Sequence, residues 1–473
     1  MRVPTCPAGA PETGRCPGGP ARPARPAPAS RRRAGVASEH ATPRSCRPRS
    51  RLGQCGDRRP LRRPRRRRRR GGAVRRDLPE PRLHPQQDAR PHGRRHGHGA
   101  GDRPLRRGRH TRRQQGRRDS GFVTVHRGRA RFTGERTLVV ETGWGEERIT
   151  TDQVVVAVGS RPVVPPSVRD SALPYETSDT IMRRRTPPRH LAVLGGGYTA
   201  AELAHVFHAA GSRITVIEKQ GTLLAPQDES VSRAYTRHAR SVFDVRTGVE
   251  LTRLEGEPGR LRLRLDDGSA IEADTLLVAV GRTPNSDTVD ADRAGITLHE
   301  DGRIVVDAQQ RTTAPGVYAL GDVCTPVPLK HVANREAQVV AHNLLHPDDP
   351  VATDYGAVPA AVFTRPQIAQ VGRTEQECRD DGLGYATATR RYSDVAYGWA
   401  LEDTTGFCKV IADPGTRRLL GAHILGPQAS TLIQPLVIAM SLGIDVPTLA
   451  RTPYWIHPAL TEVVVNALFD LDL

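Results

Sequence analysis

A histidine and a glutamate lie five positions apart in YWIHPALTEVV, near the C-terminal end of the chain. An imidazole, whose ordinary pKa lies near neutrality, can take a proton from a thiol and return it to a leaving thiolate. His457 could do this while Glu462 binds the other ring nitrogen, fixes the tautomer and stabilises the cation. Because a histidine near a glutamate is more often structural than catalytic, the surrounding sequence has to decide between the two interpretations.

A glycine-rich turn lies inside HLAVLGGGYTAAELAHVFHAAGSRITVIEK, where Gly195, Gly197 and Ala200 form G-x-G-x-x-A. The turn follows a predicted strand and opens a predicted helix, and a second predicted strand ends in Glu218. The first glycine allows the tight turn, the second lets a pyrophosphate approach, and the small third residue lets the helix pack on the strand. The segment therefore predicts a dinucleotide site. Glu218 would bind an NADH ribose and Lys219 would suit the 2′-phosphate of NADPH, so both cofactors stay open.

Three further apolar runs end at a glycine. They are DQVVVAVGSRP with Gly159, DTLLVAVGRTPN with Gly281 and Arg282, and GVYALGDVC with Gly321 and Asp322. Such runs are typical of buried strands whose ends bring the backbone close to a ligand. A carboxylate at Asp322 is placed to accept hydrogen bonds from the hydroxyls of a cofactor, although Gly-Asp at a strand end is more often only a turn.

The remaining segments predict the elements that position these residues. Alternating apolar and polar residues in FVTVHRGRARF and TLVVET predict half-buried strands. In the C-terminal third, VPAAVFTRPQIAQVG, AYGWALEDTTGFCKVIAD and RLLGAHILG are rich in strand-forming residues, whereas STLIQPLVIAMSLG and TEVVVNALF have helical apolar spacing. We expect an α/β protein with a C-terminal α+β domain for packing or dimerisation.

The charge of the chain is concentrated at one end. The 473 residues suffice for about three domains, and the formal net charge is +20. Residues 1–120 hold 35 of the 71 Lys and Arg and 8 of the 51 Asp and Glu, which leaves a net charge of −7 on the rest. The basic block has no Lys, Ile, Phe, Tyr or Trp, so it predicts disorder. With no aromatic residue interleaved for base stacking, a nucleic-acid partner is not expected.

Targeting signals and metal motifs are not evident in the sequence. No apolar run is long enough to predict a membrane span, and no signal-peptide pattern is present. The seven cysteines show no metal-ligand or C-x-x-C spacing, so we expect no metal site and reduced thiols in the cytoplasm.

Taken together, these motifs resemble the flavin-dependent pyridine nucleotide-disulfide oxidoreductases over about residues 120–473. GSRP and GRTPN resemble the family's domain-crossing strands, and ALGD resembles its FAD signature. LGGGYTAAE resembles its nicotinamide-dinucleotide site, which implies a position for Glu202 near flavin and nicotinamide. LKHVANREAQVV resembles the helix after the FAD signature and places Ala333 there, while HPALTE resembles the family's acid–base dyad.

The resemblance implies two Rossmann-like domains, for FAD and NAD(P), and a dimerisation domain. It also implies a homodimer in which His457 reaches the active site of the partner, with FAD and NADPH (or NADH) as cofactors and a small disulfide as substrate. The expected boundaries are 1–118 (half of the FAD domain), 119–163 (its remainder), 164–285 (NAD(P) domain), 286–350 (return to the FAD domain) and 351–473 (dimerisation).

The amino-acid sequences of four segments are most similar to those of the branch of the family that reduces mycothione. These are LKHVANREAQVVAHNLL, VPAAVFTRPQIAQVG, YSDVAYGWALEDTTG and YWIHPALTEVVVNAL. Alternatives that stay open are a dihydrolipoyl dehydrogenase, a metal-ion reductase of the same fold, and a catalytically dead nucleotide-binding module with a basic arm.

The family also needs an N-terminal FAD fingerprint and a C-x-x-x-x-C dithiol that cycles between disulfide and thiols. The sequence as written contains neither. Read one nucleotide further on, however, the codons from Val74 permit FGGTCLNRGCIPSKML, which has the dithiol spacing, and those of Arg49 to Gln54 permit GAGSGN, which is similar to an FAD turn. We therefore predict that residues from before about Arg49 to about Arg118 are an out-of-frame translation, and that the chain as written binds FAD poorly and reduces no disulfide.

Overall fold

The computed structural model of the protein describes residues 122–473. The predictions made for residues 1–118, disorder and an out-of-frame translation, lie outside these residues. Within the described range no helix has the length and apolarity needed to cross a bilayer.

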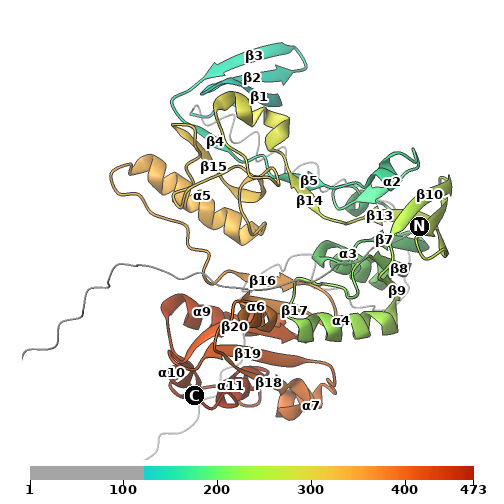
Figure 1. Cartoon of the computed structure of the whole chain (residues 1–473), viewed down its shortest axis with the longest axis vertical. Helices are drawn as coiled ribbons and strands as arrows, with labels where there is room; N and C mark the ends of the chain where they lie inside the picture. The colour runs from blue at the N-terminus through green and yellow to red at the C-terminus, as the bar shows by residue number, and fades with distance from the viewer. Residues whose placement is uncertain (1–121) are drawn as a thin grey trace, which may run out of the picture. The chain divides into compact units, whose positions relative to one another are not determined.

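The glycine-rich turn belongs to a five-stranded parallel sheet with the strand order β6-β13-β7-β8-β9 (Figure 1). All four residues of the apolar run Leu191–Leu194 are buried in its central strand, as expected for a parallel sheet covered on both faces. Helices α3 and α4 pack their buried residues against it. The elements are β6 (Glu176–Thr177), β7 (His190–Leu194), α3 (Tyr198–Ala209), β8 (Arg213–Glu218), α4 (Glu229–Val242), β9 (Asp244–Thr247) and β13 (Thr275–Val278).

A three-stranded antiparallel sheet is inserted between β9 and β13 and packs, through alternate leucines, against the other face of the parallel sheet. Its strands and the preceding short helices are α2 (Pro166–Arg169), η1 (Ile181–Arg183), β10 (Leu251–Glu257), β11 (Arg260–Leu265) and β12 (Ala270–Ala273).

The segments before and after this domain lie together. β4 pairs in parallel with β15, and β5 pairs antiparallel with β14, so residues between 120 and 163 positions apart in sequence come to adjoin. A separate antiparallel sheet precedes them. The elements are β1 (Gly128–Gly134), β2 (Thr137–Thr142), β3 (Gly145–Thr150), β4 (Val154–Val156), β5 (Ser160–Pro162), β14 (Arg282–Pro284), η2 (Ser286–Val289), η3 (Ala291–Ala294), β15 (Val317–Ala319), η4 (Gly321–Val323) and α5 (Lys330–Leu345).

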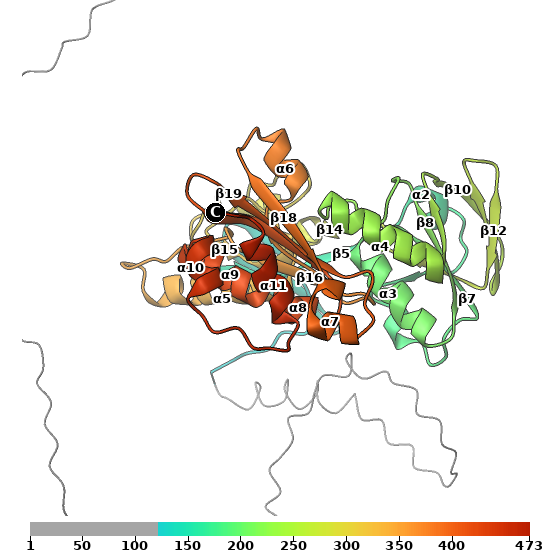
Figure 2. The same ribbon diagram turned by 90° about the horizontal axis from the view of Figure 1, so that it is seen from below.

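The C-terminal part is a five-stranded antiparallel sheet, in the order β16-β17-β20-β19-β18, with α8 to α11 over one face (Figure 2). The α+β expectation is confirmed. The elements are β16 (Pro359–Val362), β17 (Ile368–Gly372), α6 (Glu375–Asp380), β18 (Ala386–Arg391), η5 (Tyr392–Asp394), α7 (Ala396–Ala400), β19 (Phe407–Asp413), β20 (Arg418–Leu425), α8 (Ala429–Leu432), α9 (Gln434–Leu442), α10 (Val446–Arg451) and α11 (Thr461–Phe469).

Two local predictions were wrong. The strand expected over FVTVHRGRARF begins only at Gly128, because the preceding residues have no pairing partner among those described. AYGWA, expected to be part of a strand, is the short helix α7. Gly398 there packs so tightly on the Tyr392 carbonyl that a Cβ would lie 1.9 Å from its oxygen, so a local packing constraint overrides the aromatic β-propensity of the segment.

Candidate functional site

The three glycines after β7 differ in what surrounds them. Gly195 has φ +112°, and a Cβ there would lie 2.4 Å from the Ala279 oxygen of the neighbouring strand. A Cβ on Gly196 would lie 2.8 Å from Glu218 Cγ. A Cβ on Gly197, by contrast, would meet no atom within 4 Å. The first position therefore needs glycine for the fold itself, and a side chain at the second would have to displace the Glu218 side chain. Gly197, by contrast, leaves open the space at the start of α3.

That open space is part of a cavity of about 650 Å³ at the carboxyl edge of the parallel sheet. Its wall includes five of the predicted residues besides Gly197: Gly195, Glu218, Lys219, Gly281 and Arg282. The loop after β8 forms another side through Thr222, Ala225 and Pro226. Glu218 Oε1 accepts a hydrogen bond of 2.7 Å from the Gln220 backbone, which orients its carboxylate at the end of β8.

These residues fit a nicotinamide dinucleotide. The helix N-terminus, the space over Gly197 and the acid at the end of the second strand are the three features that such a ligand requires. Ala200 lies outside the cavity and is 1% exposed in the contact between α3 and the sheet, which is the packing role predicted for the third position. The open space over Gly197 would take the pyrophosphate, and Glu218 would bind the adenosine ribose.

A second group of predicted residues gathers where β4 and β15 end side by side. Ser160 Oγ donates a hydrogen bond of 2.8 Å to Asp322 Oδ2 and accepts one of 2.8 Å from Arg282 Nε. Arg282 also donates to Ser178 Oγ at 3.1 Å, across to the dinucleotide cavity. Gly159, with φ +68°, makes the turn into β5. The structure therefore connects Asp322 to the wall of the cavity.

The turn that carries Asp322 is held by a residue that the sequence did not identify. Glu336 on α5 is fully buried, accepts a hydrogen bond of 2.6 Å from the Gly321 backbone and another of 2.7 Å from the Tyr355 hydroxyl. Burial, followed by the bond to Glu336, raises the pKa of Tyr355 to about 12. A Cβ built on Gly321 would lie 3.6 Å from the Cβ of Ala333, so a larger side chain at Ala333 would crowd the turn. The sequence feature that could have identified Glu336 is its position as a charged residue on the apolar face of a predicted helix.

These residues fit one side of a flavin dinucleotide site. Within residues 122–473 the parallel sheet that leads to Asp322 consists of β4 and β15, and the sequence as written has no second glycine fingerprint to face it. The described residues alone therefore do not form a complete FAD site.

Glu202 does not line the cavity. Its Oε1 accepts a hydrogen bond of 2.9 Å from the backbone of Phe363, at the contact between α3 and the C-terminal part. Burial raises the pKa of the Glu202 carboxyl, and the Phe363 N–H opposes this shift only partly. In the described part of the chain no Lys or Arg is hydrogen-bonded to it or within 4 Å of it.

His457 and Glu462 form the predicted pair. His457 Nδ1 is 2.7 Å from Glu462 Oε1, and Glu462 Oε2 accepts from the Ala459 backbone at 3.3 Å. The side chains are 70% and 21% exposed, so the acid is held by its surroundings while Nε2 of the imidazole faces outward. Such a pair can take and return a proton at Nε2. The neighbours Tyr454 and Ile456 are strongly exposed.

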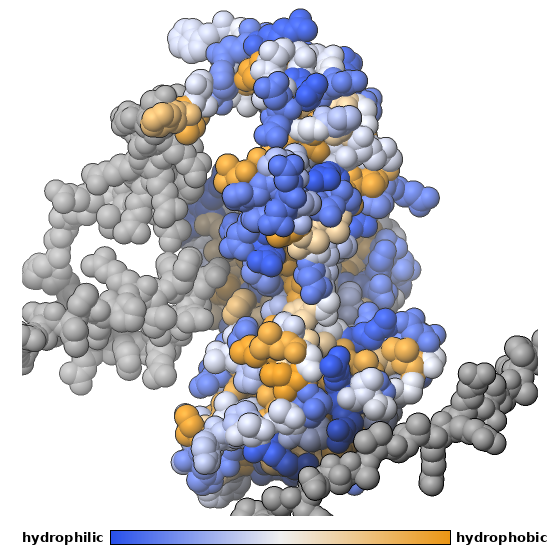
Figure 3. Space-filling model, turned by 90° about the vertical axis from the view of Figure 1, so that its left-hand side faces the viewer, coloured by the Kyte–Doolittle hydropathy of each residue, from blue (hydrophilic) through white to orange (hydrophobic). Residues whose placement is uncertain are grey.

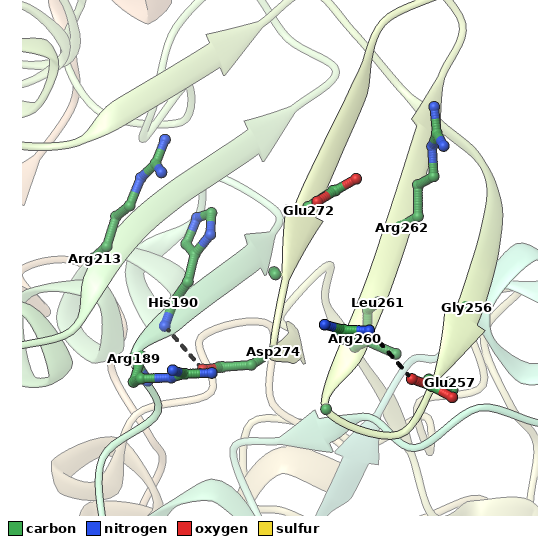
Figure 4. Close-up of a pocket in the computed structure, with 12 residues that line it drawn as sticks. Arg189, His190, Arg213, Gly256, Glu257, Arg260, Leu261, Arg262, Glu272 and Asp274 are labelled. Atoms are coloured by element: carbon green, nitrogen blue, oxygen red, sulfur yellow. Dashed lines mark hydrogen bonds and ion pairs between the residues drawn. The ribbon is translucent and has the colours of Figure 1, made fainter.

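A larger hollow of about 840 Å³ lies at the opposite, amino-terminal edge of the parallel sheet (Figure 4). Its charges are largely compensated, since Arg260 pairs with Glu257 and Arg189 with Asp274. Ligands of open α/β sheets bind at the carboxyl edge, so we assign the function to the smaller cavity.

The cysteines of the described part are free, and all three of them are buried: Cys324, Cys378 and Cys408. Burial raises the pKa of each thiol, that of Cys408 to about 12, so these residues are not reactive thiolates. Within residues 122–473 no group of His, Cys, Asp and Glu is arranged to hold a metal ion.

Comparisons with known proteins agree with this geometry. The family model described as pyridine nucleotide-disulphide oxidoreductase matches residues 82–337, and the model of that family's dimerisation domain matches residues 358–468.

Individual relatives point the same way. Mycothione reductase of Mycobacterium tuberculosis is 49% identical over 362 residues, which cover 75% of this chain and 78% of the relative. Dihydrolipoyl dehydrogenase of Vibrio cholerae is 31% identical over 350 residues, 72% of each chain. Among solved structures, the HOCl-induced flavoprotein disulfide reductase RclA from Escherichia coli aligns with a TM-score of 0.69 at 25% identity, over 76% of this chain and 82% of that one.

Proposed function

The chain belongs to the pyridine nucleotide-disulphide oxidoreductase family, and we propose that its gene encodes an NAD(P)H-dependent flavoprotein reductase of mycothione. The observation that carries the proposal is the open space over Gly197 beside Glu218, in a chain that is 49% identical to a mycothione reductase over three quarters of its length. The cofactors of the family supply a hydride from NAD(P)H and, through FAD, an electron pair to a dithiol.

His457 is the proposed acid–base residue. It protonates the thiolate that leaves when the substrate disulfide is cleaved, and it takes the proton back from a thiol in the reverse direction. Glu462, bound to Nδ1 at 2.7 Å, keeps Nε2 free for this transfer and stabilises the imidazolium. Removal of either group leaves the proton without a positioned carrier.

A homodimer brings this imidazole into a closed site. His457 is exposed in the single chain and lies in the stretch that matches the family's dimerisation domain, and the resemblance implies that it reaches the active site of a partner subunit. Ile438 and Leu442 of α9 are 53% and 71% exposed, and Figure 3 shows apolar side chains gathered over this helix. An apolar face of this kind, together with the exposed Tyr454 and Ile456, supports an interface between two copies.

NADPH is the proposed preferred cofactor, with NADH also accepted. Lys219 in the wall of the cavity provides a cation for a 2′-phosphate, and Glu218 provides an acceptor for a free 2′-hydroxyl. The three buried free thiols are consistent with a reducing cytoplasm.

The dithiol and the FAD fingerprint are proposed to be encoded in the shifted frame of the codons for residues 49–118. Two separate segments of the same frame, at the spacing that the family requires, permit both motifs. The chain as written then has a nicotinamide-dinucleotide site and an acid–base dyad without the redox sulfurs between them.

The test is an NADPH oxidation assay on two purified proteins, the chain as written and the chain with the frame restored. Mycothione, lipoamide and glutathione disulfide serve as alternative substrates. We expect the restored protein to reduce mycothione fastest and the chain as written to reduce none. Preference for lipoamide would identify a dihydrolipoyl dehydrogenase, and activity of the chain as written would contradict the shifted-frame proposal.

A further inference from the structure

We propose that Lys409 is a positioning residue for the nicotinamide dinucleotide, acting from the C-terminal domain through a buried ionic joint that fixes the loop after β8. The joint consists of Lys409, Asp228 and Glu375, together with Gln376. This inference rests on the proposed dinucleotide site and adds a residue that lies outside the cavity.

The centre of the joint is a buried lysine with two carboxylates. Lys409 Nζ lies 2.8 Å from both oxygens of Asp228 and 2.6 Å from Glu375 Oε2. The side chains of Lys409 and Asp228 are 3% and 0% exposed. Burial alone would raise the pKa of Asp228, but the bond to Lys409 and the neighbouring charge of His423 lower it, so the carboxylate stays ionised. A charged pair this deeply buried is stable only with good geometry and further hydrogen bonds.

Those further bonds tie α6 to the first turn of α4. Asp228 is the N-cap of α4 and accepts from the Ser230 backbone at 3.0 Å, and its other oxygen accepts from the Glu375 backbone at 3.1 Å. Gln376 donates to the Gln227 carbonyl at 2.8 Å and accepts from the Glu229 backbone at 3.1 Å. The start of α4 is therefore fixed from the C-terminal domain on three successive residues.

The residues just before this helix start form the adenosine side of the cavity. Thr222, Ala225 and Pro226 line it, and the Leu224 backbone donates 2.8 Å to the carbonyl of Gly196. The loop therefore has one end on the glycine turn and the other on the ionic joint. A shift of the joint therefore moves the cavity wall that would face the ribose. The joint residues themselves do not line the cavity and act on the ligand only through this loop.

The experiment measures dissociation constants for NADPH and NADH on the full chain, by calorimetry, together with the melting temperature. Two variants loosen the joint: Gln376→Ala, and the double variant Lys409→Met with Asp228→Asn. The double variant removes both fully buried charges together, and the remaining acid, Glu375, has a side chain that is 29% exposed to solvent. The control is Val410→Ala, because this neighbour on β19 is fully buried and its truncation destabilises the sheet without touching the joint.

We expect both joint variants to weaken dinucleotide binding by about fivefold or more, which corresponds to about 1 kcal/mol. The control should lose melting temperature and keep its dissociation constants within about twofold of wild type. If the double variant does not fold, Gln376→Ala alone decides. Unchanged affinity in Gln376→Ala and in any folded double variant overturns the inference while leaving the proposed function intact. A wild-type chain that binds neither dinucleotide overturns both.

Discussion

His457 Nδ1 and Glu462 Oε1 are joined at 2.7 Å although the imidazole is 70% exposed. A contact between an exposed histidine and a carboxylate contributes little to the stability of the fold. The acid is held by a second bond to the Ala459 backbone, so the pair is rigid on the side of Glu462 and open at Nε2. This arrangement suits proton transfer to a group supplied from outside the chain.

Substitution of this pair should affect turnover and spare the fold. In the frame-restored protein, His457→Gln should lower kcat for mycothione by about 10² to 10⁴-fold, the usual contribution of a general acid–base group. Glu462→Gln should cost less, because the amide oxygen still accepts a hydrogen bond from the ring. Stopped-flow turnover measures both. A His457→Gln protein with wild-type kcat would exclude the proposed role.

A side chain on Gly197 should block the dinucleotide. Gly197→Val places atoms in the open space before α3, where its Cβ would meet nothing within 4 Å, so the chain should fold as before. NADPH binding should fall by at least about a hundredfold, because the pyrophosphate loses its approach to the backbone. Gly384→Val is the matched control, since a Cβ there also meets no atom within 4 Å and Gly384 lies outside the cavity. Equal affinity of the two variants in calorimetry would contradict the site.

The acid at the end of β8 should set the balance between the two cofactors. Glu218→Ala should weaken NADH binding by about tenfold or more, because a charge-assisted hydrogen bond to the 2′-hydroxyl is lost. NADPH binding should hold or improve, since a repulsion on the 2′-phosphate disappears. Glu250→Ala removes another acid of the same cavity and should change both affinities alike. A parallel loss for both cofactors in Glu218→Ala would contradict this assignment.

Glu202 should destabilise the fold at neutral pH. Its pKa is raised by burial, so the folded state binds the proton more tightly than the unfolded state and stability falls as pH rises from the ordinary glutamate pKa through the raised one. Glu202→Gln keeps the acceptor for Phe363 and should melt at a higher temperature than wild type at about pH 8 and at the same temperature near pH 4. The exposed Glu300→Gln should show no such difference. A Glu202→Gln protein less stable at pH 8 would refute the burial argument.

The ionic joint predicts the opposite pH dependence from Glu202, because its contribution to stability is lost as pH falls. The bond to Lys409 is the largest cause that lowers the pKa of Glu375, and the pKa of Asp228 is also lowered. Their contribution to the free energy of unfolding is complete above the ordinary carboxyl values and is lost as pH falls through the lowered ones. Urea unfolding between about pH 6 and 3 should therefore show a steeper loss for wild type than for the Lys409→Met, Asp228→Asn variant. Equal slopes would show that the joint does not hold its charges.

The sequence predicted the parts of the site whose residue types are imposed by the backbone. Gly195, with its positive φ and its close contact with Ala279, marks a turn that few other residues allow, and the strands observed on both sides confirm its place in the fold. Ser160 and Lys409 act through partners far along the chain, as in the contact of Lys409 with Asp228 at a separation of 181 residues. Such contacts leave no periodic signal, so no pattern in the sequence predicted them. The strand expected over Phe122 to His126 was wrong for the related reason that strand formation depends on a partner.

The most direct measurement of the central claim is NADPH oxidation by the purified frame-restored protein with mycothione, glutathione disulfide and lipoamide compared at equal concentration. The account predicts rapid oxidation with mycothione, slow oxidation with the other two, and none in any reaction by the chain as written. Equal rates with all three substrates, or no oxidation with mycothione in a restored protein that binds both FAD and NADPH, would contradict it.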